Sequence, residues 1–325
     1  MKRRLFWIVF VTALAATIAA VILGRMFFFN PDRIFQITET YRIESAEGAE
    51  TFLNVCLPAS TSYQSVSDFQ VDGVEGYQIT TCDGWAELVA AVTADGSENL
   101  VTISYSVQLL RDAEPWDGPV LNAYAEPQQY IDSDAAAVIE QAETLRADND
   151  YETARNIFRF THTTIQPIRS QRINEEQASA SELLVEPVGG CNDYAILMVA
   201  LLRADGIPAK KIDGLSLQLP LGRAGDWTHP GGAHAWVEFY VDGKWHFADP
   251  TWGLFDKTDT AHLSYGTFES TLSSDFQQNR MLQVEQSGYI LVGAMSAPLK
   301  FMVYSTDPDA TVTPRVEVGF TWFGF

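Results

Sequence analysis

Basic residues are scarce in this chain of 325 residues, which has 21 lysines and arginines against 42 aspartates and glutamates. The formal net charge is -21 at pH 7, and Lys2, Arg3, Arg4 and Arg25 lie in an N-terminal stretch that has no acids. Binding to nucleic acid or to an anionic lipid surface needs clustered Lys and Arg. We therefore expect no nucleic-acid partner, and an acidic surface that keeps the protein soluble.

Cysteine is equally scarce, with Cys56, Cys82 and Cys191 as the three in the chain. No two of them are near neighbours, so the spacing excludes a cysteine-based zinc site. One disulfide and one unpaired thiol is a common division outside the cytoplasm. Cys56 and Cys82 either form that disulfide or remain two buried thiols that pack as small hydrophobic groups. The sequence leaves both arrangements open.

A long apolar run occurs at the N-terminus, where residues 5–23 are interrupted only by Thr12 and Thr17. As a helix this run would span about 28 Å, close to the thickness of the hydrocarbon core of a membrane. The basic residues before it predict a cytoplasmic N-terminus and an extracytoplasmic body. A cleaved signal peptide with a site at residues 13–15 is the alternative. The length of the run favours an uncleaved, single-pass anchor over residues 1–29.

The rest of the chain divides into two folded parts, and it has no internal repeat or low-complexity tract. Short alternating runs separated by turn residues predict a β-sandwich over residues 30–111. Prolines and weak periodicity predict a linker over 112–133. Residues 134–325 are expected to form an α+β catalytic domain that includes the C-terminal strands. Its predicted helices cover residues 134–146, 151–164 and 191–205.

Cys191 stands at the start of the third of these helices, after Gly189 and Gly190. The positive end of the helix dipole favours a thiolate there, and the thiolate is the reactive form of cysteine. The N–H groups at this end could hold a developing oxyanion. A lone cysteine in an apolar helix is more commonly a buried structural residue. Cys191 therefore needs partners before it can be read as a nucleophile.

His234 and Asp249 lie on two predicted strands joined by a turn at residues 242–243, a strong hairpin signal. With this turn, Asp249 falls opposite Trp236, two positions beyond His234 along its strand. A bulge, or a tilt of the chain at Pro250, would close the remaining gap. A buried aspartate needs a partner, and His234 is the nearest. The hairpin thus predicts a base and the acid that orients it.

The other histidines raise the possibility of a metal site, since His229, His246 and His262 are available besides His234. His246 and Asp249 are three apart in a strand, so their side chains face opposite sides. A metal would also compete for the catalytic histidine. We expect no metal and no cofactor, and a structural role for His246.

Five segments together resemble the core of the transglutaminase-like superfamily, a branch of the papain-like cysteine-protease fold, and these are residues 190–191, 193–195, 201–209, 234–238 and 245–252. The resemblance extends over about residues 139–252, and the β-domain before it is similar to one found in many bacterial members. It implies a buried, cysteine-bearing helix packed on an antiparallel sheet. It also implies Cys191 as nucleophile, His234 as base and Asp249 as orienter.

Members of this superfamily often supply an additional oxyanion donor upstream of the cysteine, and Gln166, Gln171 and Gln177 are candidates. No motif selects one of them, so the backbone N–H of Cys191 is the donor that we predict. The expected reaction is acyl transfer from a peptide or protein carboxamide through a Cys191 thioester. Hydrolysis by a cysteine protease, amidase or deamidase is favoured over cross-linking to an amine.

Two other functions remain open. The first is a non-catalytic interaction or assembly protein on the same fold, against which the intact Cys, His and Asp set argues. The second is acyl transfer to a small amine, as in arylamine acetyltransferases. That reaction would need a pocket for an acyl donor, and the sequence has no sign of one.

Overall fold

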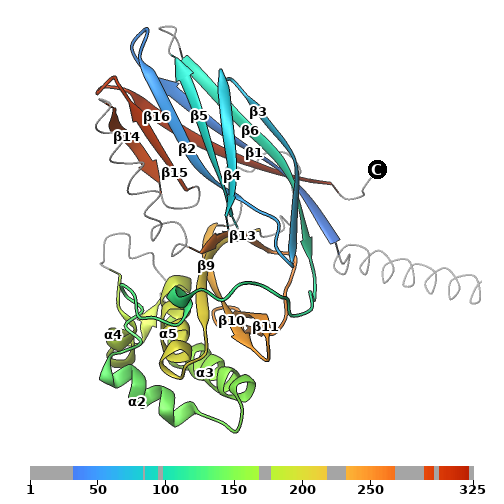
Figure 1. Ribbon diagram of the computed structural model, residues 1–325, viewed down its shortest axis with the longest axis vertical. Helices are drawn as coiled ribbons and strands as arrows, with labels where there is room; N and C mark the ends of the chain where they lie inside the picture. The colour runs from blue at the N-terminus through green and yellow to red at the C-terminus, as the bar shows by residue number, and fades with distance from the viewer. Residues whose placement is uncertain are drawn as a thin grey trace, which may run out of the picture.

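The computed structural model describes residues 32–82, 85–93, 98–167, 177–217, 232–267, 289–295 and 300–321. A β-sandwich stands at one end and an α+β domain at the other, with β9 and β13 near the junction (Figure 1). The predicted membrane anchor, residues 1–29, lies outside the described residues. Within those residues, no helix is both long and apolar enough to cross a membrane.

The sandwich consists of two antiparallel sheets. The first has the order β16 (Thr311–Thr321), β1 (Asp32–Glu44), β6 (Glu98–Leu110) and β3 (Gln64–Asp72). The second has the order β14 (Ile290–Met295), β15 (Lys300–Ser305), β2 (Glu50–Pro58), β5 (Trp85–Thr93) and β4 (Gly76–Cys82). Inward-facing side chains of both sheets form one core, which includes Ile37, Leu53, Ile103 and Val303. The alternating pattern of the sequence arises because each sheet buries one face.

The C-terminal strands differ from the prediction, which counted them with the catalytic domain. Instead β16 pairs with β1, and β15 pairs with β2. The chain leaves the sandwich after β6, forms the α+β domain, and returns to complete both sheets. Thr51 and Ser305, which bond to each other, are 254 positions apart. Local strand patterns do not identify a partner that is so distant in sequence. Without β16 and β15, however, β1 and β2 would each leave an exposed strand edge, and such an edge tends to pair with another strand.

The strand order argues against the disulfide considered for Cys56 and Cys82, because β5 lies between β2 and β4 in the sheet. Two strand spacings amount to roughly 10 Å, beyond the separation of Cα atoms that a disulfide spans. The Cys56 thiol instead donates to the carbonyl of Tyr265 at 3.7 Å.

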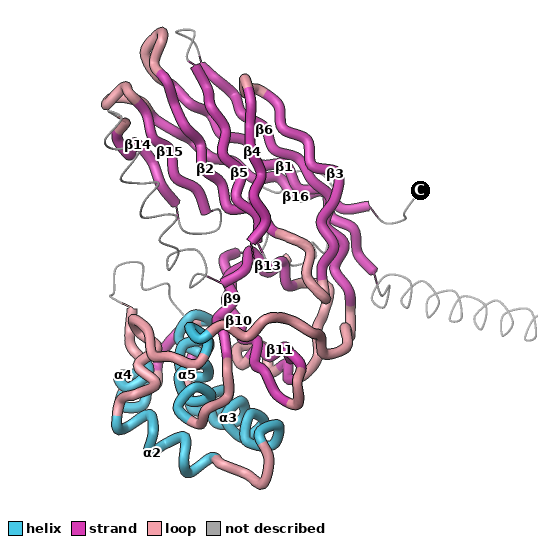
Figure 2. Tube along the Cα trace, in the orientation of Figure 1, coloured by secondary structure: helices cyan, strands magenta, loops and turns pink. Residues whose placement is uncertain are grey.

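The α+β domain packs helices against a sheet of order β12 (Leu254–Phe255), β11 (Lys244–Asp249), β10 (Gly232–Val241), β9 (Ala209–Ser216) and β13 (His262–Thr267). The helices are α2 (Ala136–Leu145), α3 (Asp150–Thr164), α4 (Ala180–Val185) and α5 (Cys191–Ala204). They cluster at the end of the molecule away from the sandwich (Figure 2). Residues from Tyr194 to Arg203 of α5 are all buried, as expected for a helix that is apolar on every side.

Strand β10 is buried on both faces. Ala235, Val237 and Phe239 face the helices and belong to their core. Trp236 lies in a separate cluster with Tyr63 of the sandwich region, and Tyr63 donates to Glu238 at 2.7 Å. His234 shares this second face with Trp236 and Glu238, because side chains alternate along a strand.

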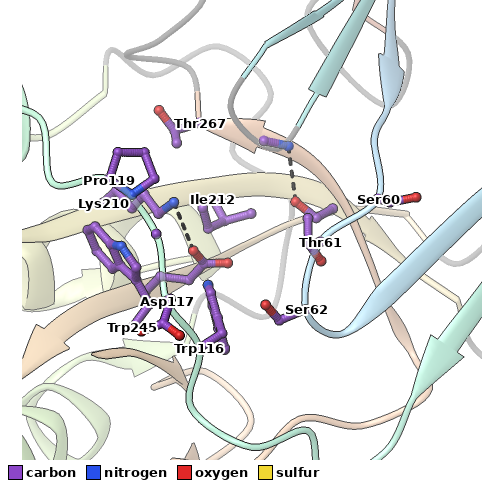
Figure 3. A pocket seen from close by; sticks show the side chains of 14 residues that line it. Ser60, Thr61, Ser62, Trp116, Asp117, Pro119, Lys210, Ile212, Trp245 and Thr267 are labelled. Carbon is purple, nitrogen blue, oxygen red and sulfur yellow. Dashed lines mark hydrogen bonds and ion pairs between the residues drawn. The ribbon is translucent and has the colours of Figure 1, made fainter. Parts of the chain in front are cut away.

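A cavity of about 290 Å³ opens at this junction, between the segment 60–62, the linker and the sheet (Figure 3). Lys210 and Glu238 form a buried ion pair of 3.1 Å in its wall, and the ammonium of Lys210 lies 4.5 Å from the ring centroid of Trp245. The linker is held there by Trp116, which exchanges two backbone hydrogen bonds with Trp245. The predicted linker is therefore fixed to the sheet.

The predicted hairpin register is confirmed. Val241 pairs with Lys244 and Val237 with Ala248. Asp242 and Gly243 form the turn with φ values of 52° and 80°, which is the backbone twist that a tight two-residue turn needs.

Gly214 of β9 is the position where added volume should be most damaging. A Cβ atom there would lie 2.1 Å from the carbonyl oxygen of Leu263 and 2.5 Å from the ring of Trp236. We expect Gly214→Ala to reduce the free energy of unfolding by about 1–3 kcal/mol, the usual cost of overpacking. Urea unfolding measures this.

Gly76→Ala is the matched control, because a Cβ atom at this strand position would meet nothing within 4 Å. It should leave the urea midpoint almost unchanged. Equal midpoints for the two variants would contradict the close contact between β9 and β13.

Candidate active site

Cys191 is the first residue of α5, and the turn before it depends on Gly189. A Cβ atom at Gly189 would lie 2.4 Å from the side chain of Asp193. That side chain accepts a hydrogen bond of 2.7 Å from the N–H of Gly190 and so fixes the entry into the helix. The thiol is partly exposed, 4.0 Å from the carbonyl of Ala233 on β10. Its backbone N–H is outside the i→i−4 ladder and can bind an anion.

The three glutamine candidates for a further oxyanion donor have different positions. Gln166 is exposed in the short strand β7 (Gln166–Pro167), and Gln171 lies outside the described residues. Gln177 lies at the first turn of α5, where its amide donates to Asp193 at 2.6 Å and accepts from Asn192. Its other amide hydrogen goes to the carbonyl of Ala178. Gln177 thus braces the start of the helix, and the Cys191 N–H remains the predicted donor.

His234 lies between Cys191 and Asp249. Its Nε2 is 2.9 Å from Oδ2 of Asp249, and the Cys191 side chain is close enough to act on its pKa. Burial acts to lower the pKa of His234, but the interactions with Asp249 and Cys191 outweigh it and raise the pKa to about 9. Trp252 stacks on the ring at a centroid distance of 4.7 Å. The imidazole is therefore fixed and protonated at neutral pH.

Asp249 ends β11, one residue beyond the last pair of the β10–β11 ladder. It pairs with Leu254 of β12, so the chain turns back between these two residues. The N–H groups of Thr251 and Trp252 donate to Oδ1 at 2.7 and 3.1 Å. Burial acts to raise the pKa of Asp249, but hydrogen bonds from two histidines hold it well below its usual range.

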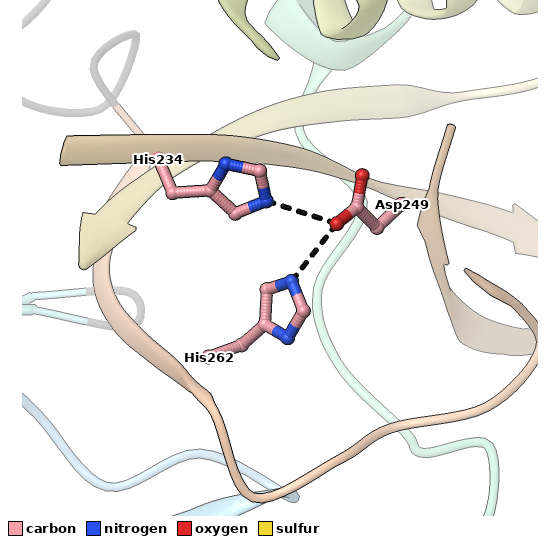
Figure 4. Close-up of side chains that lie close together, drawn as sticks. All are labelled: His234, Asp249 and His262. Atoms are coloured by element: carbon pink, nitrogen blue, oxygen red, sulfur yellow. Dashed lines mark hydrogen bonds and ion pairs between the residues drawn. The ribbon is translucent and has the colours of Figure 1, made fainter. Parts of the chain in front are cut away.

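The second of these histidines is His262, which the sequence did not assign to the site. Its Nε2 lies 3.0 Å from Oδ2 of Asp249, the same oxygen that accepts from His234 (Figure 4). It comes from β13, at the far edge of the sheet from β11 in strand order. One feature of the sequence could have indicated a role for His262, namely Asp259 three residues before it. Asp259 bonds to Nδ1 of His262 at 2.7 Å.

The remaining histidines of the predicted set lie elsewhere. His246 bonds to Asp256 at 2.8 Å and stacks on Phe239, on the helix side of the sheet, as expected for a structural residue. His229 lies outside the described residues. Ligand atoms of His234, Asp249 and His262 lie within 4.8 Å of one another, a spacing compatible with a divalent ion. The direct hydrogen bonds between these side chains account for the same spacing.

The part of the chain that carries this arrangement matches a known family. Residues 139–250, which include Cys191, His234 and Asp249, match the profile of the transglutaminase-like superfamily. The chain carries a transglutaminase-like domain. Cys191, His234 and Asp249 therefore lie in the part of the chain that carries the family likeness.

One solved structure supports the fold of the transglutaminase-like domain and its sandwich. A protein from Cytophaga hutchinsonii, provisionally described as a cysteine protease, has 17% identity and a TM-score of 0.54, covering 90% of this chain and 92% of its own. The periplasmic domain of TgpA from Pseudomonas aeruginosa has 15% identity and a TM-score of 0.34, covering 69% of this chain and 89% of its own. A comparison with curated proteins found no match. The first likeness shows a shared fold.

The elevated pKa of His234 can be measured directly by NMR titration of its ring. We expect a midpoint near pH 9 in the full-length protein. We expect a lower midpoint in Asp249→Asn, because this variant lacks the carboxylate that opposes the lowering of the His234 pKa by burial. The contribution of His234 to the free energy of unfolding is fully present below about pH 6.5 and is lost as the pH rises through about 9. The reason is that the folded state holds the His234 proton more tightly than the unfolded state does. A midpoint near the ordinary value of 6.5 in both proteins would contradict this geometry.

Proposed function

We propose that this protein is a cysteine-dependent acyl-transfer enzyme that acts on a peptide or protein carboxamide. The observation that carries the proposal is that His234 bonds to Asp249 at 2.9 Å and also lies near enough to Cys191 for the two side chains to interact. A nucleophile, its base and an orienting carboxylate in contact are the combination that thiol acyl transfer needs. The family likeness of residues 139–250 supports the same class of chemistry.

In the first half of the reaction the Cys191 thiolate attacks the carbonyl carbon, a C–S bond forms, and the carbonyl electrons move to oxygen. The N–H groups at the start of α5 stabilise this oxyanion. The oxyanion then re-forms the carbonyl, the C–N bond breaks, and the His234 imidazolium gives its proton to the departing amine or ammonia. A thioester on Cys191 remains, with His234 neutral.

In the second half, neutral His234 takes a proton from a water molecule, and the oxygen of that water attacks the thioester. The C–S bond breaks, the acid leaves, and the thiolate and imidazolium are restored. An amine in place of water would give a cross-link. We propose hydrolysis as the main outcome, because water is always present as an acceptor.

The location is also part of the proposal. The apolar run at residues 5–23 and the basic residues before it support a single-pass anchor with the enzyme on the extracytoplasmic side. Peptides and proteins outside the cytoplasm are then the accessible substrates.

A non-catalytic interaction protein is the competing function, and thiol reactivity separates the two. We expect iodoacetamide to alkylate Cys191 at pH 7 at least about ten times faster than it alkylates an ordinary thiol, because the start of a helix and a neighbouring histidine cation both favour the reactive thiolate. His234→Ala should abolish this advantage. Rates are measured by intact-mass and peptide mass spectrometry.

Two internal controls accompany this measurement. The buried Cys56 thiol should react slowly in every variant. His246→Ala removes a buried histidine that does not touch the site, and should leave the Cys191 rate unchanged. An ordinary Cys191 rate that is indifferent to His234→Ala would sink the enzymatic proposal and favour the interaction protein.

A further inference from the structure

Asp249 makes more hydrogen bonds than the orientation of one histidine requires. Its Oδ1 accepts from two backbone N–H groups, and its Oδ2 accepts from both His234 and His262. The side chain is fully buried, with 0% of its surface exposed. A carboxylate has about four acceptor positions, so this one is fully occupied. It cannot rotate without breaking two bonds at once.

His262 lies between two carboxylates. Nε2 faces Oδ2 of Asp249 at 3.0 Å, and Nδ1 faces Oδ1 of Asp259 at 2.7 Å (Figure 4). An ionised carboxylate can only accept hydrogen bonds, so both ring nitrogens of His262 must carry a proton. Burial acts to lower the pKa of His262, but the two acids outweigh it and raise the pKa. Burial likewise opposes the ionisation of Asp259, whose pKa is nevertheless lowered, chiefly by its bond to His262.

We propose that His262 is a buried imidazolium which, held by Asp259, acts as a positioning residue: it fixes Asp249 and offsets part of its negative charge. The site then contains five groups of alternating charge, which are Cys191, His234, Asp249, His262 and Asp259. The catalytic consequence rests on the proposed function. The charge state of His262 does not depend on the proposed function, and it can be tested without an activity assay.

The partial offset of the Asp249 charge by His262 matters because His234 must both hold a proton and release it. Among the residues that the structure describes, the charged or titratable groups that face His234 are Asp249, Cys191 and His262, and its aromatic neighbours Trp236 and Trp252 are uncharged. Asp249 alone would hold the proton on His234 more firmly. A cation 5.2 Å away, measured between ring centroids, weakens that hold. His234 thereby becomes a better acid for protonating the leaving group.

Contacts between β13 and the sandwich hold His262 in this position. Ser264, two residues beyond His262 on β13, exchanges two hydrogen bonds with the buried amide of Gln64, at 2.8 and 2.9 Å. Tyr265 packs in the sandwich core and contacts the hydroxyl of Tyr105 at 3.1 Å. β13 is thus tied to the sandwich on one side and to Asp249 on the other.

The test uses His262→Gln in the full-length protein in detergent. Glutamine keeps a neutral N–H donor for Asp249 and removes the charge. Ring ¹⁵N shifts of the unsubstituted protein should show both nitrogens of His262 protonated at pH 8. In His262→Gln, the titration midpoint of His234 should rise by about one to two pH units, the size expected for a unit charge at this distance.

His246→Gln is the matched control, since His246 is also buried, is paired with an aspartate and lies in the same sheet. It should leave the His234 midpoint unchanged. Asp259→Asn is the second variant, in case His262→Gln does not fold. It removes the acid that keeps His262 charged and should also raise the midpoint, by a smaller amount.

Three results would overturn the proposal. One is a neutral His262 ring at pH 8. Another is a His234 midpoint that stays level or falls in both His262→Gln and Asp259→Asn, as loosening of Asp249 alone would cause. The third is a divalent metal in the purified protein that is lost in His262→Gln, because a metal-bound ring nitrogen carries no proton. Slow alkylation of Cys191 with a protonated His262 would instead sink the proposed function and leave this inference intact.

Discussion

The carboxylate of Asp249 is the point on which the candidate site depends. It is buried, and a buried carboxylate is stable as an anion only when every acceptor position is filled. Two backbone N–H groups from the turn after β11 and two histidines fill them. Because of these four bonds, the Asp249 carboxylate is fixed beside His234, and it helps to raise the pKa of His234 to about 9.

Contacts close to this carboxylate also link the two parts of the molecule. His262 reaches Asp249 from β13, and β13 is attached to the sandwich through Gln64 and Tyr265. The sandwich in turn is completed by strands that follow the α+β domain in sequence, β14 to β16. The α+β domain is therefore inserted into the sandwich, and one residue of the candidate site depends on sandwich contacts for its position.

The sequence predicted those features that depend on local pattern. The turn at Asp242 and Gly243 determines the register of β10 and β11, and so brings His234 near Asp249. The apolar composition of α5 likewise predicts a buried helix with Cys191 at its start. The place of His262 in the site and the sheets that the C-terminal strands join were missed because the partners are distant in sequence: β13 pairs with β9, and β16 with β1. No local periodicity encodes such pairings.

Whether Cys191 forms a thioester decides the central claim most directly. Intact-mass spectrometry of the full-length protein, quenched in acid during incubation with a peptide library, would detect an acyl adduct on Cys191. We predict an adduct that hydroxylamine removes and that is absent in Cys191→Ser under the same treatment, with its mass identifying the acyl donor. An unmodified Cys191 with every peptide, in a protein whose thiol still reacts rapidly with iodoacetamide, would contradict acyl transfer from peptides.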